Sequence, residues 1–469
     1  MRTIQVLFVL LMTGHVIIAQ NLNGKVNLQQ CLDFAMNNSY EAYRANLNVS
    51  KAGYQLNEAR SDVLPQINVS GRFDHGIVLT TTMLPGELIG QSGTQIPVQM
   101  GSKNELDLGV SVEQVVFSPA LFMGIKLAKN NQELQKLRAA MTKEEVIFYV
   151  SNAYYDVLNS MQELDNLHYM ISMQDSLYML VKKRVEENVT REVDLNRIKI
   201  NLTNLQARSK NMKNIISQQK LYLRILIGVP VENDFELDDS EIEIMNISDT
   251  QDYYQIQNKI PVSKFIGNYQ TSPALLLPIE NVEIGILNKQ KESLELEILR
   301  QKREYLPTLS AIATAGYQFQ SNNLNLIKDP WYNSAIVGIR LTIPIFDGLG
   351  RRNRIKQKQI QLQMLDSDIR ETRQTISASY LNAKNKLKII DELLHVQSDN
   401  IRLAEKVYRQ TIALYTEGLA TITDIIETET SLHEVKITYT KELILYKKTE
   451  IDLLKASGRL EYLLSNSKK

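Results

Sequence analysis

Two stretches of the chain repeat apolar residues at helical spacing over roughly a hundred residues each, with almost no helix breaker. Residues 125–227 contain neither Gly nor Pro, and residues 351–457 contain no Pro and a single glycine, Gly418. Apolar residues recur three or four positions apart, as at Leu158 and Met161. Runs of this length are rare in globular domains. The pattern therefore predicts very long helices, and one of about 65 residues would extend ~100 Å.

Each long run has to turn back on itself. In the second run Gly418 marks the turn, because glycine tolerates the left-handed conformation that ends helices. Thr421 or Thr423 can then cap the returning helix. The matching position in the first run is Asn188, and Asn is the next residue most tolerant of positive φ. The sequence thus predicts two antiparallel hairpins, packed as coiled coils.

The segments that precede the long runs alternate as strands do. Ile67, Val69 and Phe73 fall on one face, and Arg72 and Asp74 fall on the other. The same alternation covers residues 106–113, 308–320 and 339–345. An ordinary half-buried sheet would also alternate. Lengths of about 10 to 13 residues, and charges confined to one face, favour tilted membrane strands.

Four strands cannot close a pore, since the smallest bacterial barrels have about eight. Several chains would have to share one barrel, and the arithmetic leaves open whether two or three do so. Residues 80–103, which are rich in Gly, Thr and Pro, are predicted to form an extended loop within the first strand pair.

An internal repeat organises the whole chain. We place the first repeat at about residues 26–230, the second at about residues 268–460, and an equatorial linker at about residues 231–268. The repeated features are a Leu-Pro pair before the strands, an aromatic residue before the long run and a glycine after it. They are Leu64-Pro65 and Leu306-Pro307, Phe117 and Phe346, and Gly228 and Gly458.

The N-terminus has the features of a secretory signal. Arg2 supplies the charge, Ile4 to Met12 supply a short apolar core, and Ala19 is a small residue suited to cleavage. We predict a signal peptide at residues 1–19 and a mature channel protomer at residues 20–469. The apolar core is too short to span a bilayer as a helix, and no later stretch is apolar enough to do so.

Composition excludes several classes of function. Lys plus Arg and Asp plus Glu both number 53, so the basic excess of a nucleic-acid-binding protein is missing. The single cysteine, Cys31, cannot form an internal disulfide. No metal-binding His motif and no Gly-rich phosphate loop is present. We therefore expect no catalytic site, no cofactor and no metal, and a chain that is not an enzyme.

The layout resembles the TolC-like family of outer-membrane efflux proteins, known as outer membrane factors. The resemblance rests on the signal peptide, the two repeats, the Leu-Pro pairs, and the turn residues Asn188 and Gly418-Leu419-Ala420-Thr421-Ile422-Thr423-Asp424. It implies a fold that is mainly α with a membrane β-barrel contribution. A homotrimer would form a 12-stranded barrel in outer-membrane lipid and a 12-helix tunnel extending into the periplasm.

The resemblance also implies partners and a role. The partners would be a periplasmic adaptor (membrane fusion) protein and an inner-membrane transporter, in a tripartite efflux pump or a type I secretion system. Drugs, metal ions, peptides and proteins all remain open as cargo. The sequence leaves two alternatives. A periplasmic coiled-coil scaffold leaves the paired strands unexplained, and a secreted enzyme would need a set of catalytic residues that the sequence does not contain.

Two sets of residues follow from the resemblance. Asp424, Glu427 and Asp194 would ring the periplasmic entrance as a gate, where clustered carboxylates attract cations; a solvated helix face with acids near its N-terminus is the competing interpretation. The residues expected at the adaptor-contacting hairpin tips are Arg184, Asn188, Val189, Thr190, Gly418, Leu419 and Ala420.

Overall fold

The structure is a computed structural model that describes residues 24–85, 90, 93, 95–233, 235–238, 281–323 and 330–465. The predicted signal peptide lies outside the described residues, as does most of the predicted linker. The chain divides into two units. The hairpin unit takes its described residues from 24–43, 143–238 and 378–465, and the strand unit from 44–142 and 281–377. Three helices contribute residues to both units: α2 (Tyr40–Ser61), α3 (Pro119–Glu186) and α9 (Gly350–Thr416).

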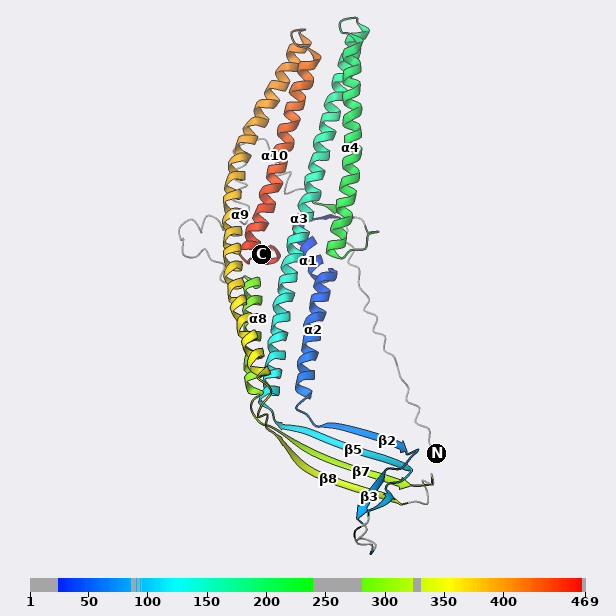
Figure 1. Cartoon of the computed structure of the whole chain (residues 1–469). Coiled ribbons are helices and arrows are strands. Elements are labelled where there is room, and N and C mark those ends of the chain that lie inside the picture. Colours follow the sequence, from blue (N-terminus) through cyan, green and yellow to red (C-terminus); the bar gives the residue numbers. More distant parts are fainter. Residues whose placement is uncertain are drawn as a thin grey trace. The chain divides into compact units, whose positions relative to one another are not determined.

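The hairpin unit is built from two long helical hairpins, one of α3 and α4 and one of α9 and α10 (Figure 1). α3 and α9 have 68 and 67 residues, and α4 and α10 have 36 and 35, so the prediction of very long helices is confirmed. Apart from α2, which has only its first residues in this unit, the elements with residues here are β1 Lys25–Val26, α1 Leu28–Asn38, α3 Pro119–Glu186, α4 Glu192–Ile227, β6 Glu236–Leu237, α9 Gly350–Thr416, α10 Ile422–Ala456 and α11 Tyr462–Ser465.

The main core of the hairpin unit lies where α1 meets the long helices. Cys31 and Leu32 of α1 are fully buried there, with Tyr154 of α3, Leu223 of α4 and Leu443 of α10. A short parallel pairing of β1 with β6 closes the same region. Cys31 thus serves as a small apolar core residue, and burial raises the pKa of its thiol to about 12.

Gly228 ends α4 in a conformation and a space that no other residue fits. Its φ is +77°, and its N–H bonds back to the carbonyls of Arg224 and Ile225. A Cβ built on Gly228 would lie 2.2 Å from the carbonyl oxygen of Asn38 at the end of α1. The glycine therefore permits the contact between α1 and the end of α4.

Replacement of Gly228 by alanine is expected to destabilise the protein markedly. The left-handed conformation alone costs an alanine about 1–3 kcal/mol, and displacing Asn38 adds a cost of similar size. Gly418→Ala is the matched control, because Gly418 has a φ of +76° and a Cβ added there would meet nothing within 4 Å. Thermal unfolding in detergent should show a clearly larger loss for Gly228→Ala, and equal losses would contradict the close approach to Asn38.

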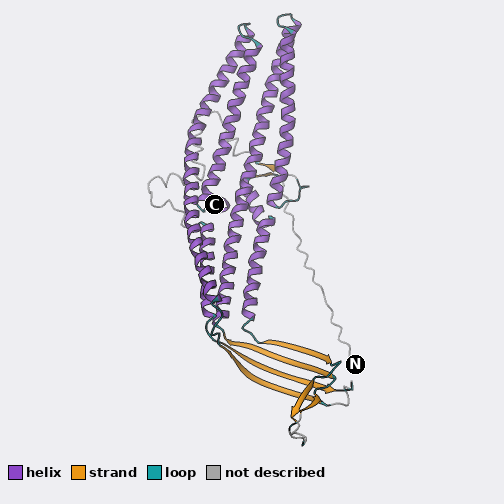
Figure 2. Ribbon diagram, in the orientation of Figure 1, coloured by secondary structure: helices purple, strands orange, loops and turns teal. Residues whose placement is uncertain are grey.

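The strand unit combines helices with a four-stranded antiparallel sheet in the order β2-β5-β7-β8 (Figure 2). α8 is tied to α3 by an ion pair between Lys289 and Glu133, and to α9 by one between Lys291 and Asp366 at 2.8 Å. The bounds of the remaining elements are α2 Tyr40–Ser61, β2 Gln66–His75, β3 Thr81–Pro85, β4 Gln95–Gln99, β5 Asn104–Phe117, α8 Val282–Arg303, β7 Thr308–Ser321 and β8 Trp331–Thr342.

The register of the sheet sorts its side chains into two faces. Residues paired directly across strands point to the same side. Ile67 pairs with Val112, Val112 with Ala313 and Ala313 with Val337, which makes one continuous apolar row across four strands. The neighbouring rows on the other face carry the polar and charged side chains, including the ion pairs Arg72–Asp107 and Arg340–Glu113, both at 3.6 Å.

Two predictions about the strands were wrong in detail. Residues 80–103 are not simply an extended loop, because β3 and β4 pair over five residues from Thr81–Gln99 to Pro85–Gln95. The β-branched residues around Thr82 and Val98 favour this ribbon, and its outward edges tolerate the prolines. The strand predicted over residues 339–345 ends at Thr342. No helix among the described residues is both long and apolar enough to cross a membrane.

Candidate functional site at the hairpin tips

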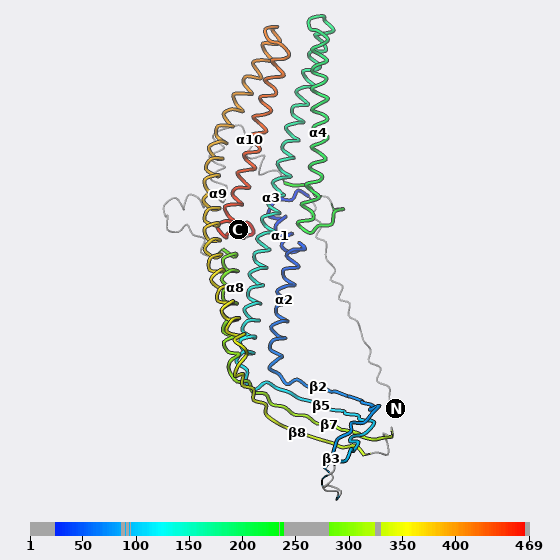
Figure 3. Tube along the Cα trace, viewed as in Figure 1, coloured from blue at the N-terminus to red at the C-terminus, as the bar shows by residue number. Residues whose placement is uncertain are grey.

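The two hairpin turns, which join α3 to α4 and α9 to α10 (Figure 3), make the same main-chain hydrogen bonds. Asn188 has a φ of +60° and Gly418 one of +76°, so both predicted turn positions are confirmed. The N–H of Asn188 bonds to the Val185 carbonyl at 3.0 Å, and the N–H of Gly418 bonds to that of Tyr415 at 3.1 Å. The following residue reaches back five positions in each turn, from Val189 to Arg184 and from Leu419 to Leu414. Both α3 and α9 thus end in a Schellman motif.

Each turn presents one large apolar side chain outward. Val189 is 60% exposed and Leu419 is 73% exposed. In a Schellman motif this residue commonly packs back on its own helix. Here both side chains remain accessible to a partner instead. Asn188 and Gly418 are also exposed, whereas Thr190 and Ala420 are half-buried; Ala420 packs against the apolar cluster of the tips.

Asp424 forms a reciprocal capping box with Thr421 at the start of α10. Its carboxylate accepts hydrogen bonds from the N–H of Thr421 at 2.7 Å and from the Thr421 hydroxyl at 2.8 Å, while the Thr421 hydroxyl accepts from the N–H of Asp424. These two bonds from Thr421 lower the pKa of Asp424 below its usual value. Thr421 is therefore the capping residue, and Thr423 is not. Glu427 lies on the same helix three residues later and is exposed.

Asp194, the corresponding acid of the first hairpin, is buried to 8% exposure. Its carboxylate lies 3.4 Å from Arg191 Nε and 3.9 Å from Arg197 Nη1. Two arginines of its own hairpin therefore surround Asp194. Within one chain Asp194 is therefore buried, whereas Asp424 and Glu427 are exposed to solvent.

Two side chains tie one hairpin to the other at the tips. Arg184 of α3 donates from Nη1 to the main-chain oxygen of Tyr415 at 2.9 Å, and its guanidinium lies 5.0 Å from the centre of the Tyr415 ring. Arg197 of α4 donates to the hydroxyl of Thr423 at 3.4 Å. Arg184 was predicted as an adaptor contact, and in one chain it lies on the neighbouring hairpin. Sequence reasoning missed Tyr415 and Arg197, since nothing in the pattern pairs them across the hairpins.

An apolar cluster beneath the turns holds the tips together. Val181 of α3, Ile198 of α4 and Ile425 of α10 are fully buried in it, and Tyr415 of α9 is nearly so. All four long helices therefore contribute to one small core at this end. Among the described residues, no group of three or more His, Cys, Asp or Glu side chains is placed to hold a metal ion.

Comparison with known proteins matches the chain to the outer membrane efflux protein family, whose model fits residues 294–459. The Outer membrane protein TolC of Salmonella enteritidis is 22% identical over 451 residues, covering 94% of this chain and 83% of the relative. The matched region of the family model runs from α8 to the end of α10. The match to TolC takes in both hairpins.

Solved structures of outer-membrane proteins share the fold. VceC from Vibrio cholerae aligns with a TM-score of 0.68 at 13% identity, covering 92% of this chain and 96% of that one. The CmeC outer membrane channel of Campylobacter jejuni aligns with the same score at 15% identity, covering 92% of this chain and 85% of that one. The family model, TolC and these folds agree, and the chain resembles the TolC-like outer-membrane efflux proteins and is located in the outer membrane.

Proposed function

We propose that the chain is the outer-membrane channel of a tripartite efflux pump or a type I secretion system. Three copies form it, and each copy adds two structural repeats. Their strands make a 12-stranded barrel in outer-membrane lipid, and their long helices make a 12-helix tunnel in the periplasm. Residues 1–19 direct export and are removed, and residues 231–268 belong to an equatorial collar. The channel conducts passively and is not an enzyme.

The observation that carries this proposal is the sheet of the strand unit. Its apolar face is exposed in one chain, with Val69 and Val337 among its most accessible side chains. Its outer strands β2 and β8 each pair on one side only within the described part of the chain. An exposed apolar face with two open edges is unstable in water. Contact with lipid would cover the apolar face, and pairing with strands of further copies would close the two edges.

The helices support assembly with further copies. Exposed aromatic residues recur along one side of α2, at Tyr40, Tyr43 and Tyr54, with Leu47 between them. α9 carries a comparable exposed apolar series that includes Met364, Leu381, Ile389, Val396 and Leu403. Exposed apolar series at helical spacing favour packing against another helix. In a closed ring of three chains, neighbouring copies cover the exposed apolar series of α2 and of α9.

In this channel the hairpin tips form the periplasmic entrance. Asp424 and Glu427 of three chains ring the aperture and favour cations, while Asp194 sets the position of Arg197 beside them. Arg184, Asn188, Val189, Thr190, Gly418, Leu419 and Ala420 form the surface for a periplasmic adaptor. Adaptor binding shifts the tips from a closed to an open arrangement. The inner-membrane transporter supplies the energy.

Planar lipid bilayers test the channel and its gate together. The purified mature protein is expected to give stepwise, cation-preferring conductance. The double variant Asp424→Asn, Glu427→Gln should lose most of that preference, because two carboxylates per chain leave the aperture. Asparagine at position 424 can still accept the hydrogen bonds from Thr421, so the cap of α10 is retained.

Glu417→Gln is the control, since Glu417 is an exposed acid outside the proposed ring. An unchanged cation preference in the double variant would remove Asp424 and Glu427 from the gate. A mature protein that stays in solution as a monomer without detergent, and gives no conductance, would contradict the channel itself and favour a periplasmic scaffold.

A further inference from the structure

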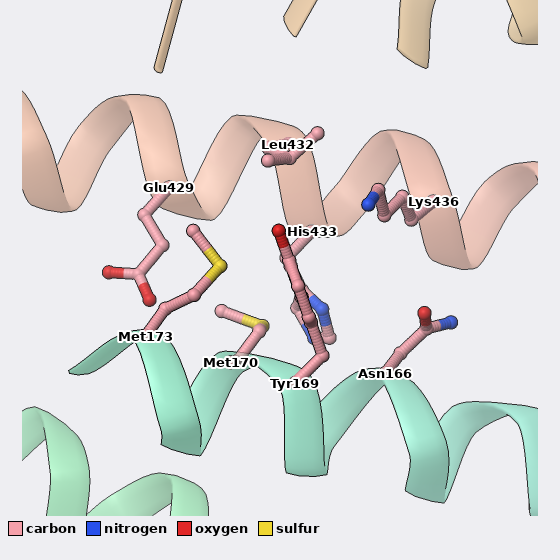
Figure 4. Close-up of a pocket in the computed structure, with 8 residues that line it drawn as sticks. All are labelled: Asn166, Tyr169, Met170, Met173, Glu429, Leu432, His433 and Lys436. Atoms are coloured by element: carbon pink, nitrogen blue, oxygen red, sulfur yellow. The ribbon is translucent and has the colours of Figure 1, made fainter. Parts of the chain in front are cut away.

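The two hairpins also meet along a seam farther from the tips. α3 contributes Asn166, Tyr169, Met170 and Met173 to it, and α10 contributes Glu429, Leu432, His433 and Lys436 (Figure 4). The cavity that they enclose has a volume of about 10 Å³, which is near the smallest that holds one water. Glu429 extends from α10 toward α3 in this view and is only 2% exposed. A carboxyl group thus lies in the contact between two hairpins, largely out of reach of solvent.

As an ionised carboxylate, Glu429 has a hydrogen bond to only one of its two oxygens. Gln174 of α3 donates from Nε2 to Glu429 Oε2. The other oxygen, Glu429 Oε1, is buried without a hydrogen-bond partner, and so is the amide oxygen of Gln174. Both oxygens can only accept a hydrogen bond while Glu429 is ionised, and burying them without a donor costs free energy. A proton on Oε1 turns it into a donor to the Gln174 oxygen, and one pair of side chains then makes two hydrogen bonds.

We propose that Glu429 is a proton-binding site: it holds a proton while the two hairpins are packed together and releases it when they separate. The hairpins of one chain then part more easily as the pH rises. The ligand is a proton, and its binding partner across the seam is the amide of Gln174. This linkage concerns contacts within one chain and does not depend on the chain conducting anything.

Among the residues that the structure describes, no cationic side chain forms an ion pair with Glu429. Lys436, two turns farther along the same face of α10, is paired with Glu405 of α9 at 2.9 Å and lies over the ring of Tyr169 of α3. Tyr408 of α9 is buried nearby, and the pKa of its hydroxyl is raised by burial and then by Glu429. Burial raises the pKa of Glu429 to about 7, against a smaller lowering by Gln174.

His433 is the other group in the seam that changes charge near neutral pH. Its pKa is lowered by burial and then by Arg208 of α4, with Glu434 of α10 acting in the opposite direction. The imidazole therefore stays neutral above its ordinary pKa of 6.5. Its protonation would weaken the seam only at lower pH, because a charge would then be buried. Above about pH 6.5, Glu429 is therefore the group in the seam whose charge changes.

The direction of the effect follows from linkage. The packed seam gives Glu429 a pKa of about 7, and contact with water returns it toward the ordinary 4.5. Between these values the packed state binds more protons than the separated state. Proton binding thus favours packing at low pH, and this contribution is lost as the pH rises through about 7. From about pH 6.5 to about pH 8, the ratio of separated to packed hairpins should rise about fourfold.

Distances between spin labels on Glu187→Cys and Glu417→Cys measure this ratio. Both positions are exposed and equivalent in the two turns, and the native Cys31 is buried and unreactive. Labelled full-length protein in detergent is diluted with unlabelled protein, so that pairs within one chain dominate. The ratio of the long-distance to the short-distance population is expected to increase about fourfold over this pH range.

Glu429→Gln should remove the pH response, because glutamine cannot release a proton. Glu429→Met is a second variant that keeps volume without a buried polar group, in case glutamine disturbs folding. Glu434→Gln, an exposed change on the same helix, should keep the wild-type response. A response that persists in both Glu429 variants, a flat wild-type response, or one of opposite sign would each overturn the proposal.

Discussion

Val337→Arg is expected to reduce the proposed trimer, detected as a heat-sensitive, detergent-resistant species in outer-membrane fractions, at least about tenfold. Val337 lies in the middle of β8, is 85% exposed in one chain, and belongs to the apolar row that continues through Ala313 and Val112. An arginine facing lipid near the middle of the bilayer costs about 2–4 kcal/mol. The proposed barrel would carry three such residues. Gel mobility of unheated samples measures the remaining trimer.

Ile336→Arg is the matched control for this change. Ile336 precedes Val337, is also a β-branched apolar residue, and is 66% exposed in one chain. It pairs with Thr314, which pairs with Ser111, and so belongs to the polar face. In the proposed barrel an arginine there would point into the aqueous lumen, so it should leave the level of the proposed trimer within about twofold of the wild type. Equal losses from both variants would contradict the assignment of the two faces.

Several features of the fold were predictable from local chemistry. The lack of glycine and proline in residues 125–227 left few places for a helix to end. The two turns were found because a left-handed residue is needed and only Gly418 and Asn188 supply it readily at equivalent positions. The resemblance to TolC-like proteins rested on the signal peptide, the two repeats, the Leu-Pro pairs and the turn residues, and it implied the outer-membrane location; the comparisons confirm the resemblance and the location.

Side-chain contacts between hairpins were not predictable, because helical periodicity gives a buried face but no partner. Asp194 matched Asp424 by spacing, yet Asp194 is buried beside two arginines and Asp424 is an exposed cap. Glu429 gave no signal at all, since an acid on a long amphipathic helix is usually solvated. Its burial depends on Gln174, 255 positions earlier in the chain.

Loss of the contacts that join the two hairpin tips is expected to increase the conductance of the proposed channel, measured without its partners. Arg184→Met keeps much of the packing on Tyr415 but removes the hydrogen bond to its main-chain oxygen and the charge over its ring. Arg197→Met removes the bond to Thr423. A charge-assisted hydrogen bond in a partly buried setting contributes about 1.5 kcal/mol or more. The opening equilibrium should therefore shift about tenfold for Arg184→Met and less for the more exposed Arg197.

Arg191→Met separates this effect from a general loss of positive charge at the tips. Arg191 is paired with Asp194, as Arg197 is, but no contact of its side chain with the second hairpin is found in the described part of the chain. Single-channel records in planar bilayers should show a larger open fraction for Arg184→Met and a wild-type fraction for Arg191→Met. If Arg191→Met opened the channel as much as Arg184→Met did, tip charge would control the entrance. The contact between the hairpins would then have no special part in keeping it closed.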